Sequence, residues 1–311
     1  MVYNDIVFRI DRCGEPTDIL PIGWKSQIAA WYAEDCPSFD YAGLVVGDDV
    51  ASATLYGKTA GCLAGVPFFD EIFALVECKV DWLMKEGAHI SVNPGEKIAI
   101  ATVTGPVRKI LLGERIGLNL LSRCSGIATM RNYVWDTYPY GNIRRIMVYN
   151  QTTPGFKLVE SYAMKIGDAN LHDQDPSMMI MLSKNHVQVC GSVSKSIKAA
   201  KDISGNALRV WVEVDNLDDA IQAAQANADV IIIKTLPMDK IVDLIKIVRK
   251  STDSLSKFGV EVTEYDKPEP RKICNGDPVD YFSWTGSGLS VILVNNYEGA
   301  PHIDFSLKLD H

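Results

Sequence analysis

The sequence lacks the features that mark secreted, membrane-spanning and nucleic-acid-binding chains. It has no long apolar run, and its opening residues, MVYNDIVFRIDRCGE, carry charges throughout, so we expect neither a signal peptide nor a membrane span. Basic residues are in the minority, and the formal net charge of −8 argues against nucleic acid or an anionic membrane as a general partner. These absences favour a soluble, cytoplasmic protein.

The sequence also lacks the cysteine patterns of metal sites and disulfide scaffolds. Its seven cysteines are scattered, with no C-x-x-C pair and no Cys/His spacing of the kind that binds zinc. An odd, scattered set is typical of free thiols in a reducing compartment. We expect free thiols here, and we predict neither a metal held by the protein nor a cofactor.

What the sequence does contain is enough length and apolar content for roughly two domains. Its 311 residues are 47% hydrophobic, which suits a sizeable core. Helices and strands are mixed up to about residue 105, which predicts a first α+β domain. Helices are predicted at 24–35 and 69–86, strands at 39–49, 52–58 and 97–103, a turn at 66–69, and a long connecting helix at 106–135.

The second half alternates between strand-like and helix-like segments. Strands are predicted at 145–150, 178–182, 209–214, 228–233, 258–262, 280–284 and 290–295, and helices from Phe156 and at 191–203, 217–226 and 237–250. Alternating β and α units indicate a parallel sheet, either open or closed into a barrel. The carboxyl ends of parallel strands meet at one edge, so the polar residues that end these strands are site candidates. They are Asn150, Ser183, Glu213, Lys234, and Thr263 with Glu264.

The stretch 146–187 contains three short motifs that resemble those of the quinolinate phosphoribosyltransferase family. The family pattern T-R-K-T-T-P-G corresponds here to Tyr149 through Gly155, H-R to His172-Asp173, and L-K-D-N-H to Leu182 through His186. Further similar segments lie at 33–49, 64–68, 111–129 and 301–311. The resemblance therefore extends over nearly the whole chain.

The resemblance implies an α/β fold with an N-terminal α+β sandwich domain and an incomplete α/β barrel. The implied boundaries are 1–125 for the sandwich, 126–298 for the barrel, and 299–311 for a C-terminal segment that packs back on the first domain. It also implies a homodimer or higher homo-oligomer, in which Arg115 is supplied to the neighbouring subunit's site. His186 matches a scaffold position of the family.

The family joins quinolinate to phosphoribosyl pyrophosphate and then releases carbon dioxide, with magnesium bridging the pyrophosphate. Both substrates are polyanions, so such a site needs arginine and lysine. According to the resemblance, this sequence keeps the family's site residues at four positions: Arg115, Lys157, His172 and Glu213. At other positions the family's charged residues are replaced. Asn150 and Gln151 occupy the places of the motif's arginine and lysine, Leu158 and Asp173 those of two arginines, and Ser183 that of a lysine, with Lys184 beside it. Lys234 occupies the place of an aspartate, and Thr263-Glu264-Tyr265 that of a glycine-rich phosphate loop.

These replacements predict weak binding of a polyanion. A charged hydrogen bond contributes on the order of 1.5–3 kcal/mol, so losing four of them would weaken binding by several orders of magnitude. Our leading hypothesis is an enzyme repurposed toward a small, weakly anionic or heterocyclic metabolite, by decarboxylation, cyclisation or isomerisation, in specialised metabolism. The alternatives are a non-catalytic paralogue that partners an active homologue, and a genuine nicotinate-nucleotide pyrophosphorylase of NAD biosynthesis.

The candidate acid/base residues are His172, Lys234 and Glu213. A buried lysine at a strand end has a lowered pKa and suits proton transfer or Schiff-base chemistry, although a salt bridge between Lys234 and Glu213 explains it equally well. His172 is equally open to a structural role. The predicted substrate-binding residues are Arg115, Asn150, Gln151, Lys157, Asp173, Ser183, Lys184, Thr263, Glu264 and Tyr265.

Overall fold

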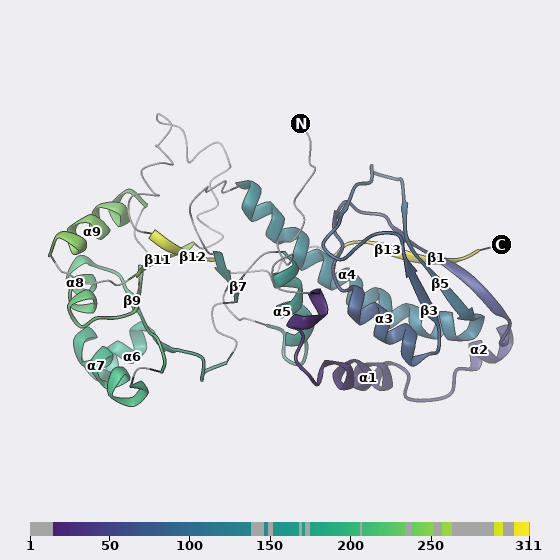
Figure 1. The fold of residues 1–311 in the computed structure, drawn as a ribbon, viewed down its shortest axis with the longest axis horizontal. Helices are drawn as coiled ribbons and strands as arrows, with labels where there is room; N and C mark the ends of the chain where they lie inside the picture. Colours follow the sequence, from purple (N-terminus) through teal and green to yellow (C-terminus); the bar gives the residue numbers. More distant parts are fainter. Residues whose placement is uncertain are drawn as a thin grey trace. The chain divides into compact units, whose positions relative to one another are not determined.

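The computed structural model describes ten stretches of the chain: 15–137, 146–148, 152–167, 170–171, 175–205, 207–233, 238–251, 257–262, 289–294 and 302–310. Their contacts divide them into two compact units (Figure 1). The first comprises the described residues within Met1–Asp136, Thr152–Ala169 and Tyr297–His311, and the second those within Thr137–Gln151 and Asn170–Asn296. The sequence boundaries assign residues 126–136 and 152–167 to the barrel domain, whereas their contacts join them to the first unit.

The first unit is built on an antiparallel sheet covered by helices. The strand order is β13-β1-β5-β3, so the end of the chain pairs with β1, for example Leu307 with Leu55. The strands are β1 (Val50–Gly57), β3 (Lys79–Trp82), β5 (Ile98–Pro106) and β13 (Phe305–Leu309), with a separate pair β2 (Gly61–Cys62) and β4 (His89–Ile90). The helices are a 3-10 turn (Pro16–Ile19), α1 (Trp24–Asp35), α2 (Tyr41–Val46), α3 (Val66–Leu75), α4 (Val107–Thr137) and α5 (Lys157–Ile166).

The core of the first unit lies between the sheet and helices α3 and α4 (Figure 1). Phe69 and Phe73 on α3 are fully buried, with ring centroids 4.6 Å apart. Gly113 and Gly117 on α4 face these rings, and a β-carbon added at either would lie 3.1 or 3.2 Å from a ring atom. The absence of a side chain at both positions therefore lets the two helices approach closely.

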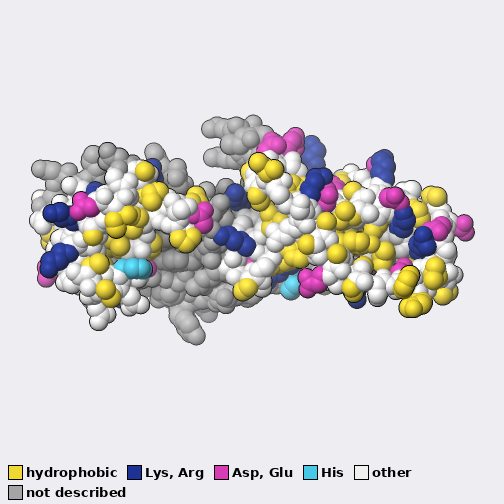
Figure 2. Space-filling model, turned by 90° about the horizontal axis from the view of Figure 1, so that it is seen from below, with side chains coloured by type: hydrophobic (Ala, Val, Ile, Leu, Met, Phe, Trp, Pro, Cys, Tyr) yellow, Lys and Arg dark blue, Asp and Glu magenta, His cyan; other side chains and the backbone are white. Residues whose placement is uncertain are grey.

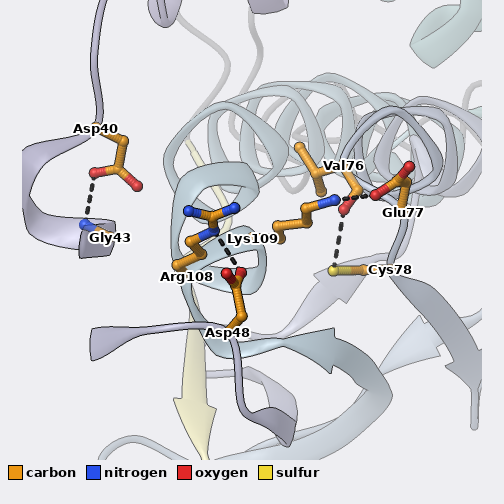
Figure 3. Close-up of polar contacts among 8 residues, drawn as sticks. All are labelled: Asp40, Gly43, Asp48, Val76, Glu77, Cys78, Arg108 and Lys109. Atoms are coloured by element: carbon orange, nitrogen blue, oxygen red, sulfur yellow. Dashed lines mark hydrogen bonds and ion pairs between the residues drawn. The ribbon is translucent and has the colours of Figure 1, made fainter. Parts of the chain in front are cut away.

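The apolar run at 39–49 forms helix α2, so the predicted strand there was wrong. Asp40 caps the helix by accepting a hydrogen bond from the Gly43 backbone N–H at 2.9 Å (Figure 3). Tyr41, Leu44 and Val45 are exposed. An apolar segment with few alternating polar residues is compatible with a strand or a helix, and here the cap by Asp40 stabilises the helix.

The predicted helix at 69–86 was only partly right. Helix α3 starts at Val66, where a turn was predicted, and ends at Leu75. Glu77 then adopts a positive φ of 59° and the chain reverses into β3. Figure 3 shows two ion pairs at the start of α4, Lys109 with Glu77 and Arg108 with Asp48. The Arg108 Nε lies 2.5 Å from the carboxylate of Asp48.

The start of α3 is held by the carboxylate of Glu86. Its two oxygens accept hydrogen bonds from the backbone N–H groups of Gly65 and Val66, each at 2.8 Å. Burial raises the pKa of Glu86 to about 7, although these two bonds oppose the rise. The folded protein therefore holds a proton on Glu86 more tightly than the unfolded chain does.

This raised pKa predicts a pH-dependent term in stability. Between about pH 4.5 and pH 7 the folded state binds more protons at Glu86 than the unfolded state, so its contribution to stability falls as pH rises. Glu86→Gln should lack this term. The difference between its melting temperature and that of the wild type should therefore shift in favour of the variant by several degrees from pH 5 to pH 8. Thermal unfolding across this range, with the exposed Glu96→Gln as control, measures it; parallel profiles for all three proteins would contradict it.

The second unit is a seven-stranded sheet in which every described pairing is parallel. The order is β7-β6-β12-β11-β10-β9-β8, so the two edge strands, β7 and β8, are neighbours along the chain. The strands are β6 (Ile146–Val148), β7 (Asn170–Leu171), β8 (Ile180–Leu182), β9 (Val210–Val214), β10 (Val230–Ile233), β11 (Lys257–Val262) and β12 (Leu289–Val294). This order is that of a barrel open between β7 and β8, as predicted.

Four helices accompany β8, β9 and β10. They are α6 (Lys184–Cys190), α7 (Val193–Ser204), α8 (Leu217–Gln225) and α9 (Met238–Ser251). Of these, α6 was not predicted, and the strand predicted at 280–284 lies outside the described residues. Each of the other predicted strands of this half overlaps an observed strand.

The two faces of the barrel sheet carry different side chains. Val212, Val214, Ile231 and Ile233 pack with the helices, as does Leu182, in one cluster. The alternate residues form a second cluster on the inner face: Met179, Trp211, Val230 and Ile232, with Met181 against them. Because side chains alternate along a strand, Glu213 and the position of Ser183 belong to this inner face.

The described surface agrees with the composition. Figure 2 shows one face on which lysine and arginine are interspersed with aspartate and glutamate rather than gathered into one basic field. None of the described helices combines the length and the apolar character that a membrane span needs. The cysteines at 36, 62, 78, 124 and 190 are free thiols, as expected.

Candidate active site

The register of the barrel strands places Glu213 in the middle of the candidate site. Leu182 pairs with Val212, so Ser183, the next residue, comes beside Glu213. On its other side Glu213 pairs with Ile232 of β10. The backbone thus carries a serine and a carboxylate side by side at the carboxyl edge of the sheet, the edge at which parallel α/β folds build their sites.

Glu213 lies at the boundary between the apolar interior and the open end of the barrel. Trp211, two residues earlier on the same face, is 5% exposed, whereas Glu213 is partly accessible. A ligand can therefore reach this carboxylate. The carboxylate can accept hydrogen bonds from the ligand or stabilise positive charge on it.

Ser183 is the N-terminal cap of α6. Its backbone N–H donates to Nδ1 of His186 at 3.2 Å and its side chain accepts from the backbone of His186, which forms a capping box; its hydroxyl also lies 2.7 Å from Nδ1. His186 therefore has the structural role that its place in the family motif implies. The pattern S-x-x-H before an apolar run was a signal in the sequence for this unpredicted helix.

Lys184 is held by a residue that sequence reasoning missed. Its Nζ lies 2.5 Å from Oδ2 of Asp215, the residue directly after β9. The other carboxylate oxygen of Asp215, Oδ1, is buried and accepts no hydrogen bond from the described residues. This ion pair links the start of α6 to the end of β9, next to Glu213.

Two further candidates belong to the first unit. Lys157 is exposed at the start of α5, directly after the turn Thr152–Gly155. Arg115 projects from α4 with 68% of its side chain exposed, and its Nε and one terminal nitrogen bind the carboxylate and the backbone carbonyl of Asp35, each at 3.0 Å. Both are therefore accessible cations at the surface of that unit.

The remaining candidates lie outside the described residues: Asn150, Gln151, His172, Asp173, Lys234, Thr263, Glu264 and Tyr265. Their roles, and the alternative salt bridge between Lys234 and Glu213, stay predictions. Over the described ranges, no three His, Cys, Asp or Glu side chains come together in a group that could hold a metal ion.

An open parallel barrel with acidic and polar side chains at the carboxyl ends of its strands defines the class as an α/β-barrel protein with a site at that edge. Models of two sequence domains match the chain, "Quinolinate phosphoribosyl transferase, N-terminal domain" over residues 39–125 and "Quinolinate phosphoribosyl transferase, C-terminal domain" over 127–264. The chain belongs to the quinolinate phosphoribosyltransferase family, as the motifs of the central stretch indicated.

Relatives of this family are similar to the chain over nine tenths of their length or close to it. The carboxylating nicotinate-nucleotide pyrophosphorylases of Dictyostelium discoideum and Rattus norvegicus are 36% and 35% identical, over 91% and 90% of this chain and 94% and 89% of theirs. The crystal structure of NadC from Streptococcus pyogenes superposes with a TM-score of 0.78 at 28% identity, over 94% of this chain and 99% of that one. The names of these relatives support the pyrophosphorylase alternative and give no support to a repurposed lyase, cyclase or isomerase.

Proposed function

We propose that this protein is a carboxylating nicotinate-nucleotide pyrophosphorylase of NAD biosynthesis. The observation that carries the proposal is the similarity of more than nine tenths of the chain to enzymes of that name. In the transfer direction, the ring nitrogen of quinolinate attacks C1 of phosphoribosyl pyrophosphate and pyrophosphate leaves with the electrons of the broken C–O bond. The C2 carboxylate then departs as carbon dioxide, and the electron pair left on the ring carbon takes up a proton.

Within this reaction Glu213 faces the sugar. Positive charge develops at C1 as pyrophosphate leaves, and a carboxylate fixed on the inner face of the barrel stabilises it. Arg115 and Lys157 are accessible cations for the carboxylates and phosphates of the substrates. Lys184 supplies a further cation that can exchange its contact with Asp215 for a phosphate oxygen.

Magnesium enters this reaction bound to the pyrophosphate of the donor, as part of the substrate. The described residues offer the carboxylates of Glu213 and Asp215 at the end of β9 but no group of three metal-binding side chains. We therefore assign no step to a metal held by these residues.

The experiment is a direct assay. Purified protein with quinolinate, phosphoribosyl pyrophosphate and magnesium should form nicotinate mononucleotide, pyrophosphate and carbon dioxide in equal amounts, measured by chromatography and by release of labelled carbon dioxide. Omitting either substrate is the control. The proposal would be wrong if none of the three products formed at millimolar substrate while a verified relative was active in the same assay.

A second candidate function is a repurposed enzyme of the same fold acting on a less anionic, heterocyclic molecule. The observation that favours it is local: where the family motif has a lysine, Ser183 caps α6, and the adjacent Lys184 is paired with Asp215. If the transferase assay yields no product while a small heterocycle raises the melting temperature of the protein, the result supports this second function. A non-catalytic paralogue would instead co-purify with an active homologue.

We also propose that the chain forms a homodimer or higher homo-oligomer, in which Arg115 reaches the neighbouring copy's site. The family resemblance and the exposure of the Arg115 side chain support this. Light scattering that finds only monomer at micromolar concentration would contradict it. The free thiols support a cytoplasmic location, which fractionation of cells can check.

A further inference from the structure

Glu160 is a fully buried carboxylate to which none of the proposed steps assigns a role. It lies on α5, one helical turn after Lys157, and has an exposed fraction of zero. A buried carboxylate is costly unless it is paired and hydrogen-bonded, so its partners show what the position is built to hold.

Three of the contacts of Glu160 converge from two other segments. The Thr153 backbone N–H donates to its Oε2 at 2.7 Å, and the Thr153 hydroxyl donates to its Oε1 at 2.9 Å. From α4, a terminal nitrogen of Arg123 donates to the same Oε1 at 3.3 Å, and Arg123 itself is only 16% exposed. One side chain thus joins α4, α5 and the turn Thr152–Gly155.

That turn has little conformational freedom left. The Phe156 N–H donates to the Thr153 carbonyl at 2.9 Å, with Pro154 and Gly155 between them and Gly155 at a φ of +82°. Proline followed by a residue of positive φ is the arrangement of a type II turn. The Gln27 side-chain amide also donates to the Gly155 carbonyl at 3.2 Å, so the turn is fixed from outside as well.

The turn lies between two groups of predicted substrate contacts. Asn150 and Gln151 precede it directly in the chain, and Lys157 follows it at the start of α5. Any movement of Thr153 therefore shifts the start of α5, where Lys157 lies. Since Glu160 binds both the backbone and the hydroxyl of Thr153, and Arg123 holds Glu160, the two residues set the position of the turn and of Lys157.

We propose that Glu160 and Arg123 are positioning residues, which lock the Thr152–Gly155 turn and so hold the predicted substrate contact Lys157 in place. The effect on catalysis rests on the proposed transferase function, whereas the locking of the turn does not. Glu160 and Arg123 themselves touch no substrate in this scheme.

The test compares Glu160→Gln with a matched control. Glutamine keeps the shape but turns one acceptor oxygen into an amide donor, so the Thr153 N–H loses its partner. The control is Asp304→Asn, the same chemical change at an exposed carboxylate paired with Lys58. In case Glu160→Gln folds poorly, Thr153→Val removes only the hydroxyl contact, and Thr153→Ser should restore it.

Two readouts separate positioning from simple structural support. Amide hydrogen exchange in peptides covering residues 152–160 should become at least about tenfold faster in Glu160→Gln and about threefold faster in Thr153→Val, with other peptides of the unit unchanged. In the transferase assay, KM for quinolinate should rise about tenfold in Glu160→Gln while kcat changes less than about threefold. Asp304→Asn and Thr153→Ser should match the wild type in both.

Each outcome decides the inference. Faster local exchange together with raised KM supports it. Unchanged exchange in the turn, or a global loss of protection with KM unaltered in an active enzyme, overturns it. If the wild type forms no nicotinate mononucleotide, the function proposal fails and the exchange arm alone decides whether Glu160 locks the turn.

Discussion

Replacing Glu213 with glutamine is expected to lower kcat for nicotinate mononucleotide formation about 100-fold or more, with little change in folding. The carboxylate lies on the inner face of the barrel at the carboxyl edge of the sheet, beside the position of Ser183. Glutamine fills the same space but carries no charge, so it cannot stabilise positive charge at the sugar carbon. Loss of one fixed electrostatic contact to a transition state costs on the order of 100- to 1,000-fold in rate.

The control for this prediction is Asp218→Asn, an exposed carboxylate at the start of α8 in the same unit. Steady-state kinetics should find it close to wild type. Circular dichroism and melting curves should be alike for all three proteins. A Glu213→Gln enzyme that retains more than about a third of wild-type kcat would remove Glu213 from the catalytic role.

Replacing Gly65 with alanine is expected to destabilise the first unit by about 2–5 kcal/mol. Gly65 has a φ of +103°, which costs a residue with a side chain about 1–2 kcal/mol. An added β-carbon would also lie 3.0 Å from the β-carbon of buried Cys124, and overpacking of this kind costs about 1–3 kcal/mol. Neither atom can move without shifting α3 or α4.

Gly95→Ala separates the two causes. Gly95 has a similar φ of +87°, but an added β-carbon there would meet nothing within 4 Å. Its loss of stability should therefore reflect the backbone alone and stay near 1–2 kcal/mol. Urea unfolding followed by tryptophan fluorescence gives both values, and equal losses for the two variants would show that the contact with Cys124 contributes nothing.

The long, strongly patterned elements were predictable from the sequence. The helix at 24–35 matches α1, and the connecting helix at 106–135 matches α4 to within two residues at either end. Apolar runs rich in β-branched residues, such as ADVIII, favour buried parallel strands. Short elements were less predictable: α2 depends on the cap by Asp40, and α6 on the box formed by Ser183 and His186.

Some residues of the candidate site were predictable from the sequence and others were not. Glu213 was found because it ends a strand, a property that can be read from the pattern of apolar residues. Asp215 and Glu160 were missed because each is paired with a cation far away in the sequence, Lys184 for Asp215 and Arg123 for Glu160. Nothing local to V-E-V-D indicates that Lys184 pairs with Asp215.

The sequence by itself determined the family, an α+β first half and a parallel sheet in the second half, and it showed several cations of the family motifs replaced at the strand ends. Apolar periodicity and motif residues are local properties of the chain. Only the tertiary structure decided which of those side chains are committed to other partners. Strand register brought Ser183 beside Glu213 and Lys184 to Asp215, and the packing of α4 against α5 buried Glu160 between Arg123 and the Thr153 turn. Such pairings depend on distances across the fold, which no local pattern of residues specifies.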